Sequence, residues 1–91
     1  MIRLNVFISV AEANRTKVLD AARELTASSL EEEGCIAYDV FESATRPDVL
    51  MICETWKDAE ALTVHSKGAV FVKNIAVLQE LATVKLEKFE F

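Results

Sequence analysis

Residues 2–10, IRLNVFISV, alternate strictly between two sets of side chains, and this pattern constrains the fold more than any other. One face of the segment would carry only aliphatic residues, and the other would carry Arg3, Asn5, Phe7 and Ser9. A period of two residues is the signature of a β-strand. The chain is therefore expected to begin with a strand that has one fully apolar face and one mixed face.

A helical period follows this strand. Asn14 is a suitable N-cap residue, because its side chain can accept a hydrogen bond from the first helical turn. Apolar and small residues then recur at three- and four-residue steps, at Val18, Leu19, Ala22, Leu25, Ser29 and Leu30. Gly34 is expected to end the helix in the left-handed conformation that glycine tolerates. The acidic run at 31–33 is interpreted as a solvated terminus.

The remaining chain repeats the two periods. Strands are predicted at 35–43 and 49–56, joined by a turn at 44–48 around Pro47. Two helical segments, 58–66 and 69–82, are separated by Lys67 and Gly68, with Asp58 as the N-cap of the first. A last strand is predicted at 83–91. The order β-α-β-β-α-β predicts an α+β, ferredoxin-like fold with an antiparallel sheet, formed by a single domain over residues 1–91.

The middle hairpin is apolar on both faces, which a sheet covered on one side does not require. Residues 49–53, VLMIC, do not alternate, and Tyr38 and Val40 lie on the face opposite Phe41. Apolar residues make up 52% of the chain, so both faces need cover. Large exposed apolar patches usually mark interfaces. The pattern predicts a homodimer in which two sheets face each other.

Charge and cysteine content exclude several classes of partner. The formal net charge is −5, and the basic residues are scattered among acidic ones, which disfavours nucleic acid and anionic membrane surfaces. No apolar run reaches the roughly 20 residues of a membrane span, and the N-terminus does not resemble a signal peptide. Cys35 and Cys53 form no CxxC motif, and are expected to be reduced thiols in a cytoplasmic protein.

Two stretches, EEEGCIAYDVFES at 31–43 and ETWKDAEALTVHSKGAVF at 54–71, carry a family resemblance. Together they resemble the antibiotic biosynthesis monooxygenase family, whose members are small dimeric α/β barrel proteins. The matching positions are Glu32, Gly34, Cys35, Tyr38, Glu54, Trp56, Asp58, Ala61, His65 and Phe71. Ala69 and Val70 stand where the family usually has a second His or an aromatic residue.

The resemblance implies a choice of chemistries. The family includes oxygenases of quinols and aromatic polyketides that use neither metal nor flavin, haem-degrading enzymes, and an enzyme that processes a quorum-sensing signal. Haem degradation is disfavoured, because the haem-degrading relatives ligate iron through a His on the second helix and the corresponding residues 72–77 contain none.

His65 is the candidate catalytic base. It follows Ala61 and Leu62 by four and three residues, which places it on the apolar face of its helix, pointing toward the sheet. An imidazole titrates near neutrality and suits proton abstraction from a phenol. The alternative is a core histidine bonded to backbone. His65 is the only histidine, which excludes a catalytic zinc site with several His ligands.

Other residues are candidates for the same site. Asn5 would face the helices and a pocket if the fully apolar face of the first strand met a partner sheet. Tyr38 could donate its hydroxyl group to a substrate or simply pack in the sheet. Trp56 is interpreted as a packing anchor whose N–H reaches a backbone carbonyl, or else as a stacking wall for a planar ligand.

Three further residues complete the candidate set. Phe71 and Val70 would line an apolar substrate pocket or belong to the core. Glu54 could pair with Arg3 or Lys85, and this interpretation is favoured over a catalytic role.

The function that these residues and the resemblance predict is a cofactor-independent monooxygenase of small aromatic or quinol-like compounds. The substrate would lie between sheet and helices, and His65, with Asn5 or Tyr38, would deprotonate or orient it. No phosphate-binding glycine motif is present, and no cofactor or metal is expected. The alternative is a dimeric module that binds or isomerises a small metabolite without oxygen.

Overall fold

The structure, a computed structural model, describes residues 1–91 and contains one four-stranded sheet. The strands are β1 (Ile2–Val10), β2 (Cys35–Glu42), β3 (Val49–Trp56) and β4 (Ala82–Glu90). They lie in the order β2-β3-β1-β4, and every neighbouring pair is antiparallel. Each of the four predicted strands is present, and the ferredoxin-like fold predicted from the sequence is confirmed.

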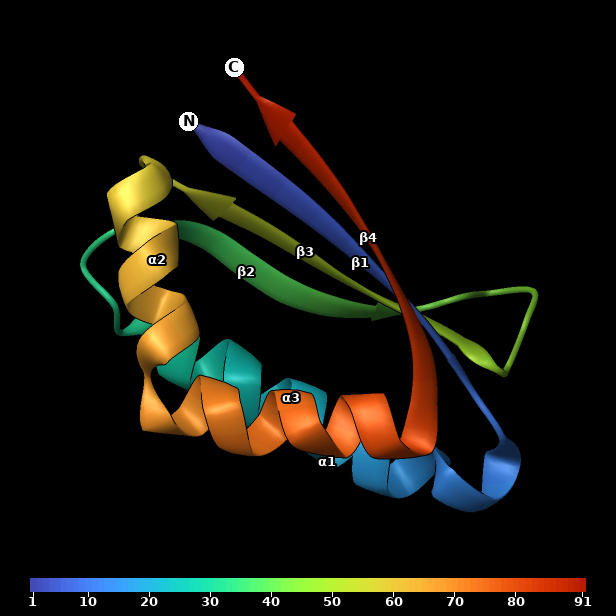
Figure 1. The fold of residues 1–91 in the computed structure, drawn as a ribbon. Helices are drawn as coiled ribbons and strands as arrows, with labels where there is room; N and C mark the ends of the chain where they lie inside the picture. The colour runs from blue at the N-terminus through green and yellow to red at the C-terminus, as the bar shows by residue number, and fades with distance from the viewer.

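Three helices cover one side of this sheet (Figure 1). They are α1 (Glu12–Leu30), α2 (Ala59–Lys67) and α3 (Ala69–Leu81). α1 and α3 run side by side beneath the strands, whereas the short α2 stands at an angle at one end (Figure 1). The two helical segments predicted in the second half are therefore separate helices, with the break at Gly68 as expected. None of the three helices is long and apolar enough to cross a membrane.

The aliphatic face of β1 packs against these helices. Its five residues, Ile2, Leu4, Val6, Ile8 and Val10, are all buried. Val6, Ile8 and Val10 join the buried apolar residues of α1 and the inner residues Leu50 and Ile52 of β3 in one core. Leu30, expected on the buried face of α1, is instead exposed.

Some of the helix ends predicted from the sequence are present in the structure and others are not. The prediction that Asn14 caps α1 was wrong, because the cap position is Ala11 and the Asn14 backbone N–H donates to the Ala11 carbonyl. Asp58 does cap α2, since its side chain accepts a hydrogen bond from the Ala61 N–H at 2.8 Å. Gly68 has φ −68° and ψ 147°, an extended conformation that ends α2 and starts α3.

Gly34 has a different role from the one predicted. No glycine has a positive φ, so the left-handed helix end is absent. A Cβ atom at Gly34 would instead lie 2.2 Å from the Cβ of Ala61 on α2. The missing side chain is what lets α2 approach the start of β2 closely.

The other side of the sheet carries a row of apolar side chains that no helix covers. Phe41, Met51 and Phe7 are register partners across β2, β3 and β1. Phe41 is 48% exposed, and Met51 and Phe7 are partly exposed. The prediction that the middle hairpin is apolar on both faces is confirmed.

Candidate functional site

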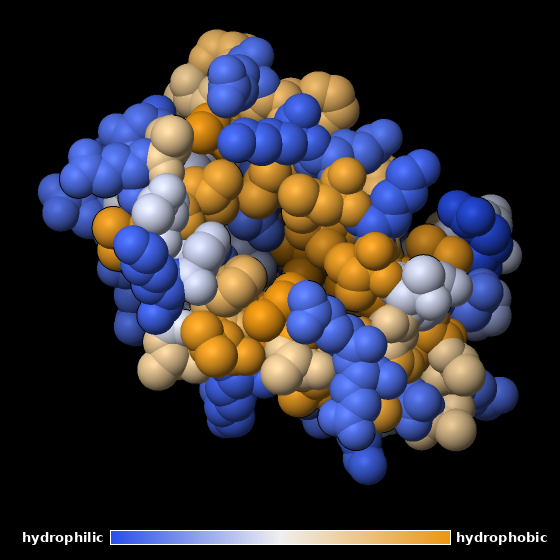
Figure 2. Space-filling model, viewed as in Figure 1, coloured by the Kyte–Doolittle hydropathy of each residue, from blue (hydrophilic) through white to orange (hydrophobic).

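A cavity of about 310 Å³ lies between the sheet and the helices. It is largely apolar, since 11 of its 15 lining residues are hydrophobic. The remaining four are Glu54, His65, Ser66 and Lys88. Figure 2 shows apolar side chains gathered around a hollow in the region bounded by α2, α3 and the strands. Such a site suits a small apolar ligand with one or two polar groups.

The chain path explains why the cavity lies at this end of the sheet. α2 has nine residues and ends at Lys67, and the extended Gly68 then turns the chain into α3. α2 and α3 run in different directions (Figure 1). Side chains from both helices therefore line the cavity opposite Leu4 and Val6 of the sheet. The space between them remains open.

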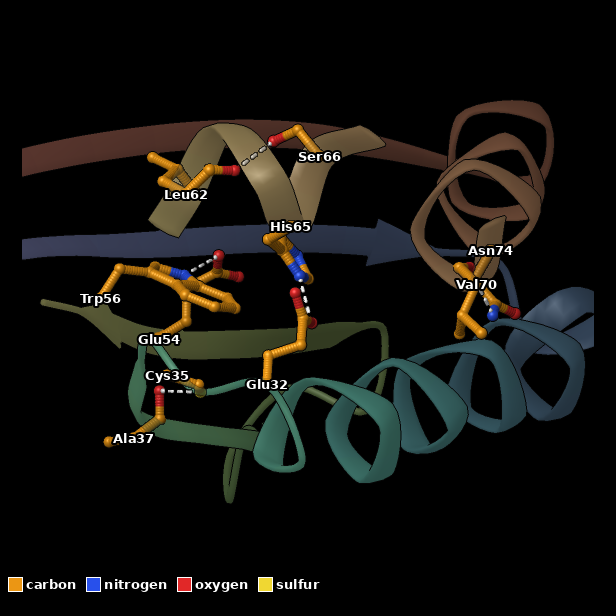
Figure 3. A network of polar contacts seen from close by, with 10 residues as sticks. All are labelled: Glu32, Cys35, Ala37, Glu54, Trp56, Leu62, His65, Ser66, Val70 and Asn74. Atoms are coloured by element: carbon orange, nitrogen blue, oxygen red, sulfur yellow. Dashed lines mark hydrogen bonds and ion pairs between the residues drawn. The ribbon is translucent and has the colours of Figure 1, made fainter. Parts of the chain in front are cut away.

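His65 points from α2 into this region, as the spacing predicted. Only 3% of its surface is exposed, and its Nδ1 lies 2.8 Å from Oε2 of Glu32 (Figure 3). A carboxylate has only acceptor atoms, so Nδ1 carries the hydrogen, and in the neutral form of the imidazole Nε2 keeps a free lone pair. Nε2 is buried and has no protein partner. The expected backbone partner of a core histidine is therefore absent.

Glu32 is a site residue that the sequence reasoning missed. It was interpreted as part of a solvated acidic terminus, yet its side chain is partly buried and reaches His65 across 33 positions of sequence. The signal that could have found it was its place beside Gly34, where a close approach of α2 brings the two segments together.

Trp56 lies behind His65 and does not line the cavity. It is fully buried, and its ring centroid is 4.3 Å from that of the imidazole. Its Nε1 donates to Oε1 of Glu54 at 2.9 Å, and not to a backbone carbonyl as predicted (Figure 3). The second interpretation, a stacking wall for a ligand, is also wrong, because the face of Trp56 is occupied by His65. Trp56 holds two cavity side chains in place.

Glu54 was assigned the wrong partners. Strand alternation places it on the helix-facing side with Ile52, while Arg3 and Lys85 lie on the opposite face of the sheet. Arg3 instead donates to the Thr55 hydroxyl group at 3.2 Å. Glu54 is 4% exposed and lines the cavity. Burial raises the pKa of its carboxyl group, although the Trp56 N–H acts in the opposite direction.

Tyr38 and Phe71 also line the cavity. Tyr38 is 6% exposed, and burial together with the nearby Glu54 raises the pKa of its phenol. The Tyr38 hydroxyl group is thus neutral and available as a hydrogen-bond donor or acceptor. Phe71 packs its ring 5.0 Å from His65, nearly edge-on at 68°. The structure brings three of the candidates, His65, Tyr38 and Phe71, to one cavity.

Two other candidates lie elsewhere. Asn5 was expected to face the helices, but its neighbours Leu4 and Val6 do so, and the alternation of β1 turns Asn5 to the open side. The fully apolar face of β1 meets the helices and not a second sheet. The condition under which Asn5 would face the helices is therefore not met. Val70 is absent from the cavity lining, and its carbonyl oxygen accepts a hydrogen bond from Asn74 at 2.9 Å (Figure 3).

The side chains offer no cluster suited to a metal ion. No group of three or more His, Cys, Asp or Glu residues lies close enough together to bind one. The groups that face the cavity are instead an imidazole, a carboxyl group, a phenol and two further polar side chains, Ser66 and Lys88. These groups can exchange protons and hydrogen bonds with an organic ligand.

Comparison with known proteins identifies relatives over nearly the whole chain. YcnE of Bacillus subtilis (strain 168), which carries a provisional monooxygenase name, is 33% identical over 87 residues, or 96% of this chain and 92% of that protein. A crystal structure from Bacteroides thetaiotaomicron VPI-5482, described as a conserved protein of unknown function and a candidate oxidoreductase, is 64% identical. It has a TM-score of 0.97 and covers 99% of this chain and 96% of its own.

A more distant structure shares the fold alone. SnoaB from Streptomyces nogalater, a cofactor-independent oxygenase whose structure was solved in a mutant form, has a TM-score of 0.86 at 13% identity. The alignment covers 99% of this chain and 91% of SnoaB. The sequence profile described as antibiotic biosynthesis monooxygenase matches residues 1–76. These names support a monooxygenase-type function, and the chain belongs to the antibiotic biosynthesis monooxygenase family.

Proposed function

We propose that this protein is a cofactor-independent monooxygenase of small aromatic or quinol-like compounds, with the substrate bound between sheet and helices. The observation that carries the proposal is the unpartnered Nε2 of His65 beside a largely apolar cavity of about 310 Å³. Membership of the family and the oxygenase description of SnoaB support this class of reaction.

His65 starts the reaction. Glu32 accepts the Nδ1 hydrogen, so Nε2 takes the phenolic proton of the substrate. The resulting phenolate carries negative charge on a ring carbon, and such an electron-rich carbon can reduce molecular oxygen directly. The positive charge that develops on the imidazole is stabilised by the Glu32 carboxylate at 2.8 Å.

The surrounding side chains orient the substrate and exclude water. Phe71, Leu62 and Ile75 provide apolar walls for an aromatic ring. The Tyr38 hydroxyl group belongs to the cavity lining and hydrogen-bonds a substrate oxygen in this proposal. Trp56 keeps the imidazole plane fixed, because a ring 4.3 Å away on one side leaves His65 little rotational freedom.

The first experiment measures oxygen uptake and quinone formation on a panel of quinols, naphthols and anthrones. We expect His65→Ala to lower the rate by about 10²–10⁴-fold, the range of general-base catalysis. Thr63→Ala is the matched control, since Thr63 is exposed on the same helix and its hydroxyl group bonds only to the Ala59 carbonyl.

Two outcomes would contradict this proposal. Equal activity of a folded His65→Ala variant would remove His65 from the mechanism. Thermal stabilisation by the same compounds without any oxygen uptake would instead favour a binding or isomerase-like module on the same scaffold.

We further propose that two copies associate through the open faces of their sheets. The row Phe41–Met51–Phe7 supports this, because it is an apolar surface that nothing within the chain covers. Sedimentation is expected to show a dimer at micromolar concentration, and Met51→Lys is expected to dissociate it. A stable wild-type monomer at that concentration would contradict this interface.

A further inference from the structure

Glu54 is a buried group that the first steps of the proposed reaction do not use. Its carboxyl group lies in the wall of the cavity, 4% exposed, and forms no ion pair. The Trp56 N–H donates to Oε1, and the Tyr38 hydroxyl group lies close enough to affect the pKa of the same carboxyl group. Burial in these apolar surroundings raises the pKa of the carboxyl group, against the lowering effects of the Trp56 N–H and the His65 charge.

The groups around Glu54 come from every element that meets it. Tyr38 on β2 and His65 on α2 line the same cavity and lower the pKa of the Glu54 carboxyl group, whereas the charge of Glu32 raises it. Cys35 also lies near Glu54. Lys88 stands in the same cross-strand row, two strands away through Leu4, at roughly 10 Å from the spacing of adjacent strands. None of these groups forms an ion pair with Glu54.

The position of Glu54 relative to His65 is the second observation. Glu54 belongs to β3 on the floor of the cavity, and His65 belongs to α2 in its roof. Trp56 contacts both side chains, because its N–H donates to Glu54 and its ring centroid lies 4.3 Å from that of the imidazole. One cavity is therefore lined by a carboxyl group and an imidazole that share the same tryptophan neighbour.

We propose that Glu54 is the general acid that protonates the departing oxygen when a substrate hydroperoxide collapses to a quinone. This inference rests on the proposed monooxygenase function and assigns the second half of that reaction. Glu54 is a catalytic residue in this scheme, since its free oxygen would touch the reacting O–O group.

The steps balance with molecular oxygen as the oxidant. His65 takes the phenolic proton, the ring carbon forms a bond to oxygen, and the protonated imidazole returns its proton to the peroxide anion, which gives a hydroperoxide. His65 then removes the hydrogen from the same carbon, the electron pair forms C=O, and the O–O bond breaks. Glu54 gives its proton to the leaving hydroxide, and the protonated His65 afterwards restores Glu54. One phenol and one O₂ yield one quinone and one water.

A second proton donor is needed because of the timing of the collapse. The imidazole takes the ring-carbon proton in the same step in which hydroxide departs, so it cannot also be the acid. Without an acid, the leaving group is a hydroxide ion in an apolar cavity, which is costly. Proton donation by Glu54 avoids the formation of that ion.

The test separates oxygen uptake from quinone formation. In Glu54→Gln the side-chain oxygen still accepts from Trp56 and the volume is nearly unchanged, but the proton is absent. We expect oxygen uptake to persist, collapse to slow by about 10²-fold or more, and free organic hydroperoxide to appear in an iodide or ferrous-dye assay. Glu80→Gln, an exposed change on α3, controls for loss of charge. Glu54→Asp is expected to recover part of the quinone yield.

The results distinguish the role of Glu54 from the proposed function on which it rests. A wild type that consumes no oxygen with any quinol contradicts the proposed function itself. A wild type that consumes oxygen, with one quinone per O₂ in both wild type and Glu54→Gln, contradicts the role of Glu54 alone.

A pH series on the wild type tests the same role if Glu54→Gln does not fold. Burial raises the pKa of Glu54, so the acid form is present at low pH and is lost as pH rises through that raised value. Hydroperoxide is then expected to increase relative to quinone with rising pH. A ratio that stays constant from pH 5 to 9 would overturn the assignment.

Discussion

The space between the sheet and the helices has two ends that differ in packing. At one end, called the solid end below, Ile8, Leu50 and Val18 are at most 1% exposed and fill the gap between β1, β3 and α1. At the other end, called the hollow end below, the same sheet and α2 border the cavity that Glu54 and His65 line. One apolar strand face can therefore supply both a solid core and a site, depending on how the helices cover it.

The chemistry lies at the hollow end for a physical reason. Ionisable side chains are tolerated in a small domain only where they have partners or room for a ligand. His65 has Glu32 as a partner, and Glu54 has Trp56. At the solid end, the buried faces of the long helices α1 and α3 cover the sheet mainly with small and apolar side chains.

The largest expected loss of stability follows from a substitution at the solid end. Leu50→Ala removes a fully buried side chain and should lower the free energy of unfolding by about 2–5 kcal/mol. Ile75→Ala, on the cavity wall, should cost less than half as much, because Ile75 is only partly buried and borders open space. Urea unfolding at one fixed protein concentration measures both. Equal losses would show that the two ends are packed alike.

A smaller loss of stability is expected at the contact between Gly34 and α2, which borders the hollow end. Gly34→Ala would place a Cβ atom 2.2 Å from Ala61, so α2 must shift, at a cost of about 1–3 kcal/mol. Gly68→Ala is the control, since its added atom meets only the His65 carbonyl oxygen, at 3.3 Å. Thermal unfolding is expected to show a clear loss for the first and little change for the second. Ala61→Gly should restore part of the loss in the Gly34→Ala background, and no recovery would argue against this contact.

The smallest effect on stability, but a measurable one on activity, is expected at Glu32. Glu32→Gln removes the charge that holds the Nδ1 hydrogen of His65, so the rate of oxygen uptake should fall and its pH optimum should move. Glu33→Gln is the matched control, because that side chain is exposed and next in the chain. A pH–rate profile identical to the wild type in Glu32→Gln would show that this carboxylate does not set the tautomer.

Much of the fold could be predicted from local pattern. The alternation of residues 2–10, the two helical periods and the Asp58 cap indicated the order and nearly the bounds of every element. Two predictions of helix ends were wrong, at Asn14 and at Gly34, and the second concerns a position set by a tertiary contact. Position 34 is glycine because another helix lies against it, which no local rule reveals.

The candidate site was predicted in part. Helical spacing turned His65 inward, and Tyr38 and Phe71 reached the same cavity. The prediction for Asn5 was wrong because it depended on the aliphatic face of β1 meeting another sheet. That face packs on the helices, so the alternation of the strand turns Asn5 away from the cavity.

Short-range alternation along the chain was enough to set the periods, the α+β order and the presence of apolar residues on both faces of the hairpin. Which of those faces meets the helices was settled by packing in three dimensions. The same packing brings Glu32 to His65 and places Glu54 and Trp56 beside it. Glu32 lies 33 positions before His65, and the crossing of α2 over the sheet brings these two residues together.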